Sequence, residues 1–285
     1  MNTPALVSAE WLLQNHQNKH VAVLDCSMDA TILYPGTWES GPKEFAEAHI
    51  PGAQFFDIDK TSDPSSGLPH TLPKPENFQS VMRELGINAD DHIVVYDNCL
   101  LRSAARGWWM FRVMGHSRVS VLDGGFEAWR QAGGPMESGV KTPTAGNFTA
   151  SFQPDLFHSK QDMLEILSTK ERQIIDARGA PRFRGDVPEP RPGLASGHIP
   201  GALNVPYSSL YKDSGKLRPK ADLERAFSAS QVDFARPIVT SCGSGVTACN
   251  LALALYVLGK PDVPIFDGSW VEWGSADDLP IETSA

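Results

Sequence analysis

The chain has 285 residues, 41% of them hydrophobic, so it is long enough for one large or two ordinary domains with a buried core. Its formal net charge of −9 and the lack of a Lys/Arg cluster argue against a nucleic-acid partner. No apolar run is long enough to cross a bilayer, and the N-terminal region lacks the features of secretory or mitochondrial targeting signals. We therefore expect a globular cytoplasmic protein that binds neither nucleic acid nor membrane.

Short β-branched runs alternate with amphipathic stretches along the chain, which predicts an α/β fold of parallel sheets with helices on both faces. In the first half, Val21–Cys26 is typical of a strand. In the second half, Val246–Leu258 is expected to form a helix that is closed by Gly259 and stopped by Pro261. The strands expected in the second half are Gln173–Asp176, Ala202–Val205, Ile238–Thr240 and Pro264–Phe266.

The two halves of the chain repeat each other. Segments of similar sequence recur in the same order about 150 residues apart, which indicates two copies of one domain. We expect the histidines that begin one of these segments to anchor loops rather than to act in catalysis. The matching pairs are His49–Ala53 with His198–Ala202, Val23–Asp25 with Ile174–Asp176, and Asp123–Trp129 with Asp267–Trp273.

The region between the copies has a different composition. Gln131–Pro154 is rich in Gly, Pro, Thr and Ser and shows little periodicity, as is typical of an extended linker. The predicted organisation is a non-catalytic domain at 1–135, a linker at 136–154 and a catalytic domain at 155–285.

One cysteine has the surroundings of a nucleophile. Cys242–Ala248 lies between the predicted strand Ile238–Thr240 and the predicted helix. Ligand sites in open α/β sheets form beyond the carboxyl ends of the strands, where Cys242 falls. The N–H groups of a Gly-rich turn and of a helix N-terminus would stabilise a thiolate there.

The other cysteines lack that context, and we expect Cys26, Cys99 and Cys249 to be structural. With no close CxxC pair and no His cluster at ligand spacing, neither a metal site nor a disulfide framework is predicted, and the compartment should be reducing. Alignment of the repeats puts Asp97 opposite Cys242, so the first copy should lack the nucleophile.

These repeats and the Cys242–Ala248 loop resemble the tandem rhodanese-domain sulfurtransferases over almost the whole chain. Within that family the loop is similar to that of 3-mercaptopyruvate sulfurtransferases, whereas thiosulfate-preferring members typically carry Arg-Lys in place of Gly243 and Ser244. The resemblance implies that the Cys242 thiolate takes sulfur from 3-mercaptopyruvate as a persulfide and releases pyruvate. The acceptor would be a thiol, thioredoxin or cyanide, and no metal or organic cofactor is implied.

The resemblance also implies roles for other residues. Arg182 and Arg191 would bind the donor carboxylate and ketone, because a guanidinium matches a carboxylate in shape and charge. Ser244, His70 and Asp57 would form a relay that protonates the leaving group. The rest of the loop would bind the anionic sulfur through its backbone, namely Gly243, Gly245, Val246 and Thr247.

Three alternatives differ in their demands on the loop. A thiosulfate:cyanide sulfurtransferase would favour cationic side chains at Gly243 and Ser244, where this chain has none. A Cys-dependent phosphatase or arsenate reductase needs an Arg at the position of Ala248, which excludes this class. A non-catalytic sulfur carrier should have a degenerate cysteine site, whereas Cys242 is intact. This alternative therefore requires that a partner residue of the cysteine is missing, which the sequence alone does not show.

Overall fold

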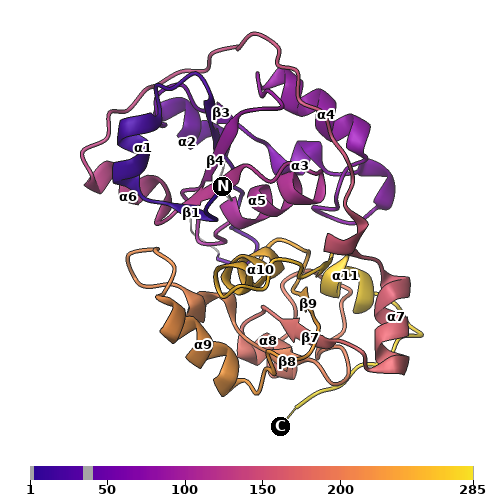
Figure 1. Ribbon diagram of the computed structural model, residues 1–285. Coiled ribbons are helices and arrows are strands. Elements are labelled where there is room, and N and C mark those ends of the chain that lie inside the picture. Colours follow the sequence, from indigo (N-terminus) through magenta and orange to yellow (C-terminus); the bar gives the residue numbers. More distant parts are fainter. Residues whose placement is uncertain (1–2, 35–40, 285) are drawn as a thin grey trace. The chain divides into compact units, whose positions relative to one another are not determined.

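The computed structural model describes residues 3–34 and 41–284, so residues 1–2 and 35–40 of the predicted first domain and residue 285 of the second lie outside the described part (Figure 1). The chain divides into two compact units. The first takes in the described residues of Met1–Asp63, Leu72–Gln153 and Asp213–Lys216, and the second those of Pro64–Thr71, Pro154–Lys212 and Leu217–Ala285.

The first unit contains a five-stranded parallel sheet with the order β1-β5-β4-β2-β3. Val, Ile and Tyr dominate its central strand β4, four of whose five residues are buried. This composition is expected for a strand that is covered on both faces. The strands are β1 (Leu6–Val7), β2 (Val21–Asp25), β3 (Gln54–Phe55), β4 (His92–Tyr96) and β5 (Val119–Leu122).

The second unit has a sheet of the same kind, in the order β6-β10-β9-β7-β8. When the strands are counted from the start of each unit, the two sheets have the same strand order, so the repeat in the sequence is also a repeat of topology. The predicted strands are confirmed, with bounds that differ by one residue or fewer at each end. The strands are β6 (Phe157–His158), β7 (Gln173–Asp176), β8 (Leu203–Asn204), β9 (Ile238–Ser241) and β10 (Ile265–Phe266).

Helices flank both sheets, as predicted for an α/β fold. In the first unit they are α1 (Ala9–Asn15), α2 (Gly41–Glu47), α3 (Ile58–Thr61), α4 (Pro75–Glu84), α5 (Ala104–Val113) and α6 (Gly125–Gln131). In the second unit they are α7 (Lys160–Thr169), α8 (Ala180–Arg184), α9 (Lys220–Ala229), α10 (Ala248–Val257) and α11 (Ser269–Trp273). Short 3-10 turns occupy Pro64–Ser66, Pro154–Leu156 and Tyr207–Leu210.

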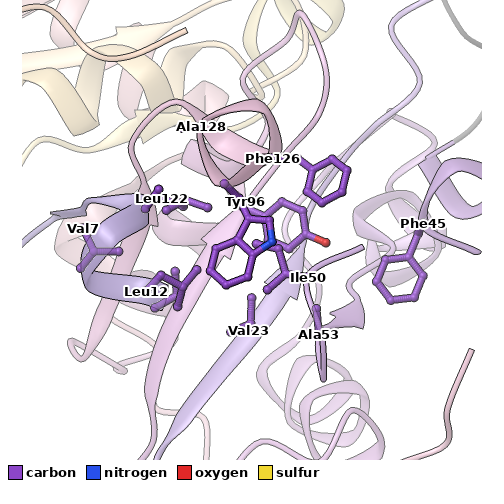
Figure 2. Close-up of a cluster of buried hydrophobic side chains, with 13 residues drawn as sticks. Val7, Leu12, Val23, Phe45, Ile50, Ala53, Tyr96, Leu122, Phe126 and Ala128 are labelled. Atoms are coloured by element: carbon purple, nitrogen blue, oxygen red, sulfur yellow. The ribbon is translucent and has the colours of Figure 1, made fainter. Parts of the chain in front are cut away.

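Each unit has its own apolar core. In the first, Tyr96 of β4 stacks on Phe126 of α6 with 5.9 Å between the ring centroids, and Figure 2 shows the aliphatic side chains around them. In the second, Val239 of β9 packs in a cluster with Trp270 and Trp273 of α11, and both tryptophans are fully buried. Burial of these rings is a main source of stability for each sheet.

The repeated histidines anchor loops in both units, in agreement with the sequence-based expectation. His49 Nδ1 contacts the Phe45 carbonyl oxygen at 2.7 Å, and His198 Nδ1 contacts that of Phe183 at 2.8 Å. Each imidazole also stacks on that phenylalanine ring, with centroids 4.0 and 3.8 Å apart. Both histidines are 3% exposed, so they hold the turn before the next strand.

Candidate active site

The loop after β9 buries its cysteine. Cys242 follows directly on β9 and is 1% exposed, and α10 begins six residues later at Ala248. Gly245 adopts φ +76°, a left-handed conformation that glycine tolerates without strain, and it turns the chain toward the helix. Ser244, Val246 and Thr247 are also buried, whereas Gly243 is half-buried.

The start of α11 holds this loop in place. Trp270 donates its N–H to the Cys242 carbonyl oxygen at 3.0 Å, and Val271 donates to that of Gly243 at 2.8 Å. The Cys242 N–H is in turn donated to Ser269 Oγ at 3.1 Å, and the same oxygen lies 3.9 Å from Cys242 Sγ. These contacts hold the backbone of Cys242 through both its N–H group and its carbonyl oxygen.

A cationic side chain from α8 lies beside the loop. A Cβ atom built on Gly243 would be 3.2 Å from Arg182 Nη2, so the guanidinium sits next to the residue that follows the cysteine. Glu189 holds this arginine through contacts of 2.5 Å to Nη2 and 3.2 Å to Nε. The Arg182 side chain is still 18% exposed, whereas that of Glu189 is only 2% exposed.

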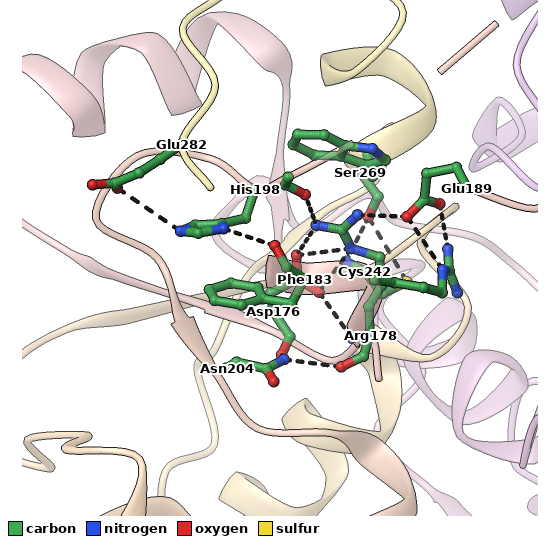
Figure 3. A network of polar contacts seen from close by, with 12 residues as sticks. Asp176, Arg178, Phe183, Glu189, His198, Asn204, Cys242, Ser269 and Glu282 are labelled. Carbon is green, nitrogen blue, oxygen red and sulfur yellow. Dashed lines mark hydrogen bonds and ion pairs between the residues drawn. The ribbon is translucent and has the colours of Figure 1, made fainter. Parts of the chain in front are cut away.

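Behind Arg182 lies a buried ion network, which Figure 3 shows. Arg178 Nη1 contacts Glu189 Oε1 at 2.8 Å, and Arg178 Nη2 contacts Asp176 Oδ2 at 2.8 Å. Burial opposes the charge of Arg178, but the two carboxylates outweigh it and raise the pKa of its guanidinium. Arg178 also lies over the Trp270 ring, 4.3 Å from its centroid, which links the network to the element that holds Cys242.

Two predicted site residues from distant parts of the sequence meet in the second unit. Arg191 Nη2 lies 3.1 Å from His70 Nε2. Since a guanidinium can only donate, the imidazole nitrogen accepts in this contact, and its proton is then on Nδ1. His70 has φ +62°, which is unusual for a residue with a side chain. The contact therefore joins the segment Pro64–Thr71 to the arginine loop of the same unit.

Asp57 lies in the first unit, at the N-cap of α3. Its Oδ1 accepts the Lys60 N–H at 3.0 Å, and its Oδ2 lies 3.2 Å from Lys60 Nζ. Asp57 thus has a local capping role. The second unit contains all the other predicted site residues: His70, Arg182, Arg191 and the loop from Cys242 to Thr247.

The first unit has a carboxylate where the second has its cysteine. Asp97 follows β4, and its carbonyl oxygen accepts the Phe126 N–H at 2.9 Å, just as that of Cys242 accepts the Trp270 N–H. The Asp97 carboxylate accepts the N–H of Ala104 at the start of α5 (2.7 Å), so an internal group occupies the helix end.

Burial raises the pKa of Cys26 strongly and that of Cys99 to about 11, which leaves both as unreactive thiols.

Metal ligands do not gather around Cys242 within residues 3–34 and 41–284. The one group of three candidate ligands found there is His20, Asp90 and Asp91, in the first unit. Among the described helices, none combines the length and apolar character that a bilayer-spanning segment needs.

Three residues near the site had no role in the sequence-based interpretation: Arg178, Glu189 and Ser269. Arg178 and Glu189 lie only 11 residues apart, but a charged residue in a loop is usually exposed, so the sequence alone does not indicate that these two are buried and paired. Ser269 did leave a signal, since the second copy has Asp-Gly-Ser where the first has Asp-Gly-Gly ending at Gly125.

A family model described as a rhodanese-like domain matches the chain twice, at residues 8–132 and 159–276. The chain belongs to the rhodanese family, as a sulfurtransferase with two tandem rhodanese-like domains.

Its relatives include enzymes named for two different sulfur donors. The 3-mercaptopyruvate sulfurtransferase of Escherichia coli K12 is 44% identical over 283 residues, which cover 99% of each chain. The human 3-mercaptopyruvate sulfurtransferase is 42% identical over 271 residues, 94% of this chain and 91% of its own. The thiosulfate sulfurtransferase of Bos taurus is also 42% identical, over 272 residues that cover the same shares.

Solved structures agree with this assignment. The crystal structure of SseA from Escherichia coli, described as a 3-mercaptopyruvate sulfotransferase of the rhodanese fold, matches with a TM-score of 0.85 at 42% identity and covers 94% of this chain and 99% of its own. Tum1 from Saccharomyces cerevisiae matches with a TM-score of 0.89 at 30% identity over the full length of both chains.

Proposed function

We propose that this sulfurtransferase moves sulfur from 3-mercaptopyruvate to a thiol or cyanide acceptor through a persulfide on Cys242, and releases pyruvate. One observation carries the proposal: a buried cysteine begins a Gly-rich loop between β9 and α10, and the Arg182 guanidinium lies beside the next residue, Gly243. This arrangement supports the proposal, because a small α-keto acid donor needs a nucleophile for its sulfur and a cation for its carboxylate.

The chemistry has two half-reactions. The Cys242 thiolate attacks the donor sulfur, an S–S bond forms, the carbon–sulfur bond breaks, and its electron pair leaves as the enolate of pyruvate. The enolate then takes up a proton. An acceptor thiolate or cyanide next attacks the outer sulfur and restores the Cys242 thiolate. The backbone N–H groups of Gly243, Gly245, Val246 and Thr247 are the donors we assign to the anionic sulfur between these steps.

Arg182 and Arg191 are assigned to the carboxylate and ketone of the donor. Arg182 is suited to this role because Glu189 restrains it while part of its guanidinium stays exposed. Arg191 is restrained differently, by its contact with His70 Nε2.

For the proton step we assign Ser244, His70 and Asp57. Ser244 is close in sequence to Cys242, and His70, whose Nε2 accepts from Arg191, has its other ring nitrogen, Nδ1, for proton exchange. The proposed domain division is a non-catalytic domain at 1–135, a linker at 136–154 and a catalytic domain at 155–285. We further propose a cytoplasmic location, and thioredoxin as one acceptor of the sulfur.

Thiosulfate is the competing donor. Overall similarity does not separate the two donors, since relatives named for either one are 42% identical to this chain. Gly243 and Ser244 favour 3-mercaptopyruvate, because neither supplies a cation for a dianionic donor. The narrow space between Gly243 and Arg182 supports the same choice, since a long side chain at position 243 would displace the arginine.

The test is steady-state turnover of the whole chain with each donor and with cyanide as acceptor. We expect a higher kcat/KM for 3-mercaptopyruvate, and Cys242→Ser should abolish turnover. A preference for thiosulfate would replace the donor, and no turnover with either donor would favour a sulfur carrier. A trapped persulfide at Cys242, identified by mass spectrometry after incubation with donor alone, would locate the transferred sulfur.

A further inference from the structure

The second unit contains a cavity of about 490 Å³ that is separate from the cysteine loop. It lies among α7, β7 and β8, which Figure 1 labels, at the N-terminal end of β7. Strand β7 pairs with β9, with Gln173 opposite Ile238 and Asp176 opposite Ser241. Cys242 therefore lies at the opposite, C-terminal end of the strands, roughly 13 Å from the level of Gln173.

The floor of this cavity is aliphatic. Ile166 and Leu167 of α7, Ile174 of β7 and Leu203 of β8 line it, and Ile166 and Ile174 belong to the buried core. A cavity of this volume is in the range that encloses small organic ligands. An apolar group bound there would pack against the core of the unit and lose contact with water on that side.

The mouth of the cavity is cationic. Lys170, Arg172 and Arg236 line it, opposed by the single carboxylate of Glu282, although the chain as a whole has a net charge of −9. Arg236 is held in place because its Nη2 donates to the Lys170 carbonyl oxygen at 2.8 Å. Among the residues the structure describes, no hydrogen bond or ion pair engages the side chains of Lys170 or Arg172, and Arg172 is half-buried. Such a guanidinium is prepared to bind an anion.

Two further features favour a ligand at this mouth. Arg172 and Arg236 also line a second cavity of about 310 Å³, so both arginines lie where the two cavities adjoin. Gln231 at the mouth has φ +62° just after α9, whereas in the first unit the residue at the same place after α4 is Gly86, with φ +77°. The second unit thus keeps a long polar side chain where glycine would cost less.

From these features we infer a binding site for an amphipathic organic anion: a carboxylate or phosphate monoester whose group contacts Arg172 and Arg236 and whose unbranched apolar body fills the aliphatic cavity. This site goes beyond the sulfur-transfer function and does not depend on it.

The test is isothermal titration calorimetry of the full chain with octanoate and with octyl phosphate. Octanol and acetate serve as ligands that lack the charge or the apolar body. We expect saturable binding of at least one amphipathic anion, weakened by salt, and little binding of octanol or acetate. Arg172→Gln should weaken binding at least about tenfold, as for the loss of one charge-assisted hydrogen bond. Leu167→Gln should also weaken it.

The control is Arg225→Gln, which removes the same charge from an exposed position on α9 that pairs with Asp222. This control should bind like the unmodified chain, and all variants should retain sulfur transfer. The relative affinities of octanoate and octyl phosphate identify which anionic group the site prefers. No saturable binding, equal binding of octanol, or equal affinities of the Arg172 and Arg225 variants would overturn the inference.

Discussion

Ser269 accepts the backbone N–H of Cys242 at 3.1 Å, and its hydroxyl oxygen lies 3.9 Å from the Cys242 sulfur. The single hydroxyl hydrogen is donated to the Phe266 carbonyl oxygen at 2.8 Å. Ser269 is fully buried and has φ +50°, a conformation that costs about 1 kcal/mol for a residue with a side chain. At the matching place in the first unit Gly125 has φ +59°, and a Cβ there would lie 2.4 Å from the Asp97 carbonyl oxygen. Only the unit with the cysteine keeps the serine.

Replacement of Ser269 should separate strain from positioning. Ser269→Ala keeps the strained backbone and loses the acceptor for Cys242 N–H, so we expect a lower melting temperature and about a tenfold lower kcat. Ser269→Gly loses the same acceptor but relieves the strain, so it should melt higher than the alanine variant with a similar loss of kcat. Full activity in both variants would show that the hydroxyl does not position the cysteine.

Glu189 should act on donor binding through Arg182. In Glu189→Gln the charge that holds both Arg178 and Arg182 is lost, and an amide N–H group faces a guanidinium. We expect KM for 3-mercaptopyruvate to rise about tenfold with a smaller change in kcat, because ground-state carboxylate binding is weakened. Glu189→Asp should restore part of the affinity. Asp186→Asn, in an exposed pair with Arg184, is the matched control. A lower melting temperature with an unchanged KM would limit Glu189 to a structural role.

The fold could be predicted from the sequence because its signals are local and occur twice. Gln173–Asp176 is buried throughout, and the predicted strand has the observed bounds. The predicted helix Val246–Leu258 corresponds to α10 (Ala248–Val257), which begins two residues later because the residues before it complete the cysteine loop, and which ends one residue earlier. Gly259 ends it with φ +90°.

The site was only partly predictable. The cysteine loop is one continuous segment between a strand and a helix, so its place could be inferred from the sequence around it. The contact between His70 and Arg191 could not, because 120 residues separate them and no local pattern joins them. Asp176, Arg178 and Glu189 are close in the sequence, but their burial could not be predicted, because charged residues are usually exposed to solvent.

Asp25 should make stability depend on pH. It matches Asp176 of the second unit, but Ser27 stands where that unit has Arg178, so Asp25 is buried without this cation. Burial raises the pKa of Asp25 from 3.8 to about 6. Between these values the folded chain holds a proton that the unfolded chain releases, so stability falls as pH rises through this window, by up to about 3 kcal/mol.

Asp25→Asn should remove this penalty. The melting temperature of the variant minus that of the unmodified chain should increase as pH rises from 4 to 7, and it should then stay constant. Asp29→Asn, at an exposed position in the same unit, should show no such trend. A difference that is constant across the whole pH range would mean that Asp25 does not titrate in this window.

Gly243 and Ser244 should set donor preference. The change of both residues to Arg-Lys, Gly243→Arg with Ser244→Lys, adds two cations beside Cys242 and forces a side chain into the space next to Arg182 Nη2. Added positive charge favours the thiosulfate dianion, while displacement of Arg182 weakens binding of a carboxylate donor. We expect the ratio of kcat/KM for 3-mercaptopyruvate to that for thiosulfate to fall at least about tenfold. Gly243→Ala is the control for crowding alone, because it adds a Cβ 3.2 Å from Arg182 Nη2 but no charge. The long Arg182 side chain can shift to make room for this Cβ. If the alanine variant changes the ratio as much as the Arg-Lys variant does, then space beside Arg182, and not loop charge, decides between the donors.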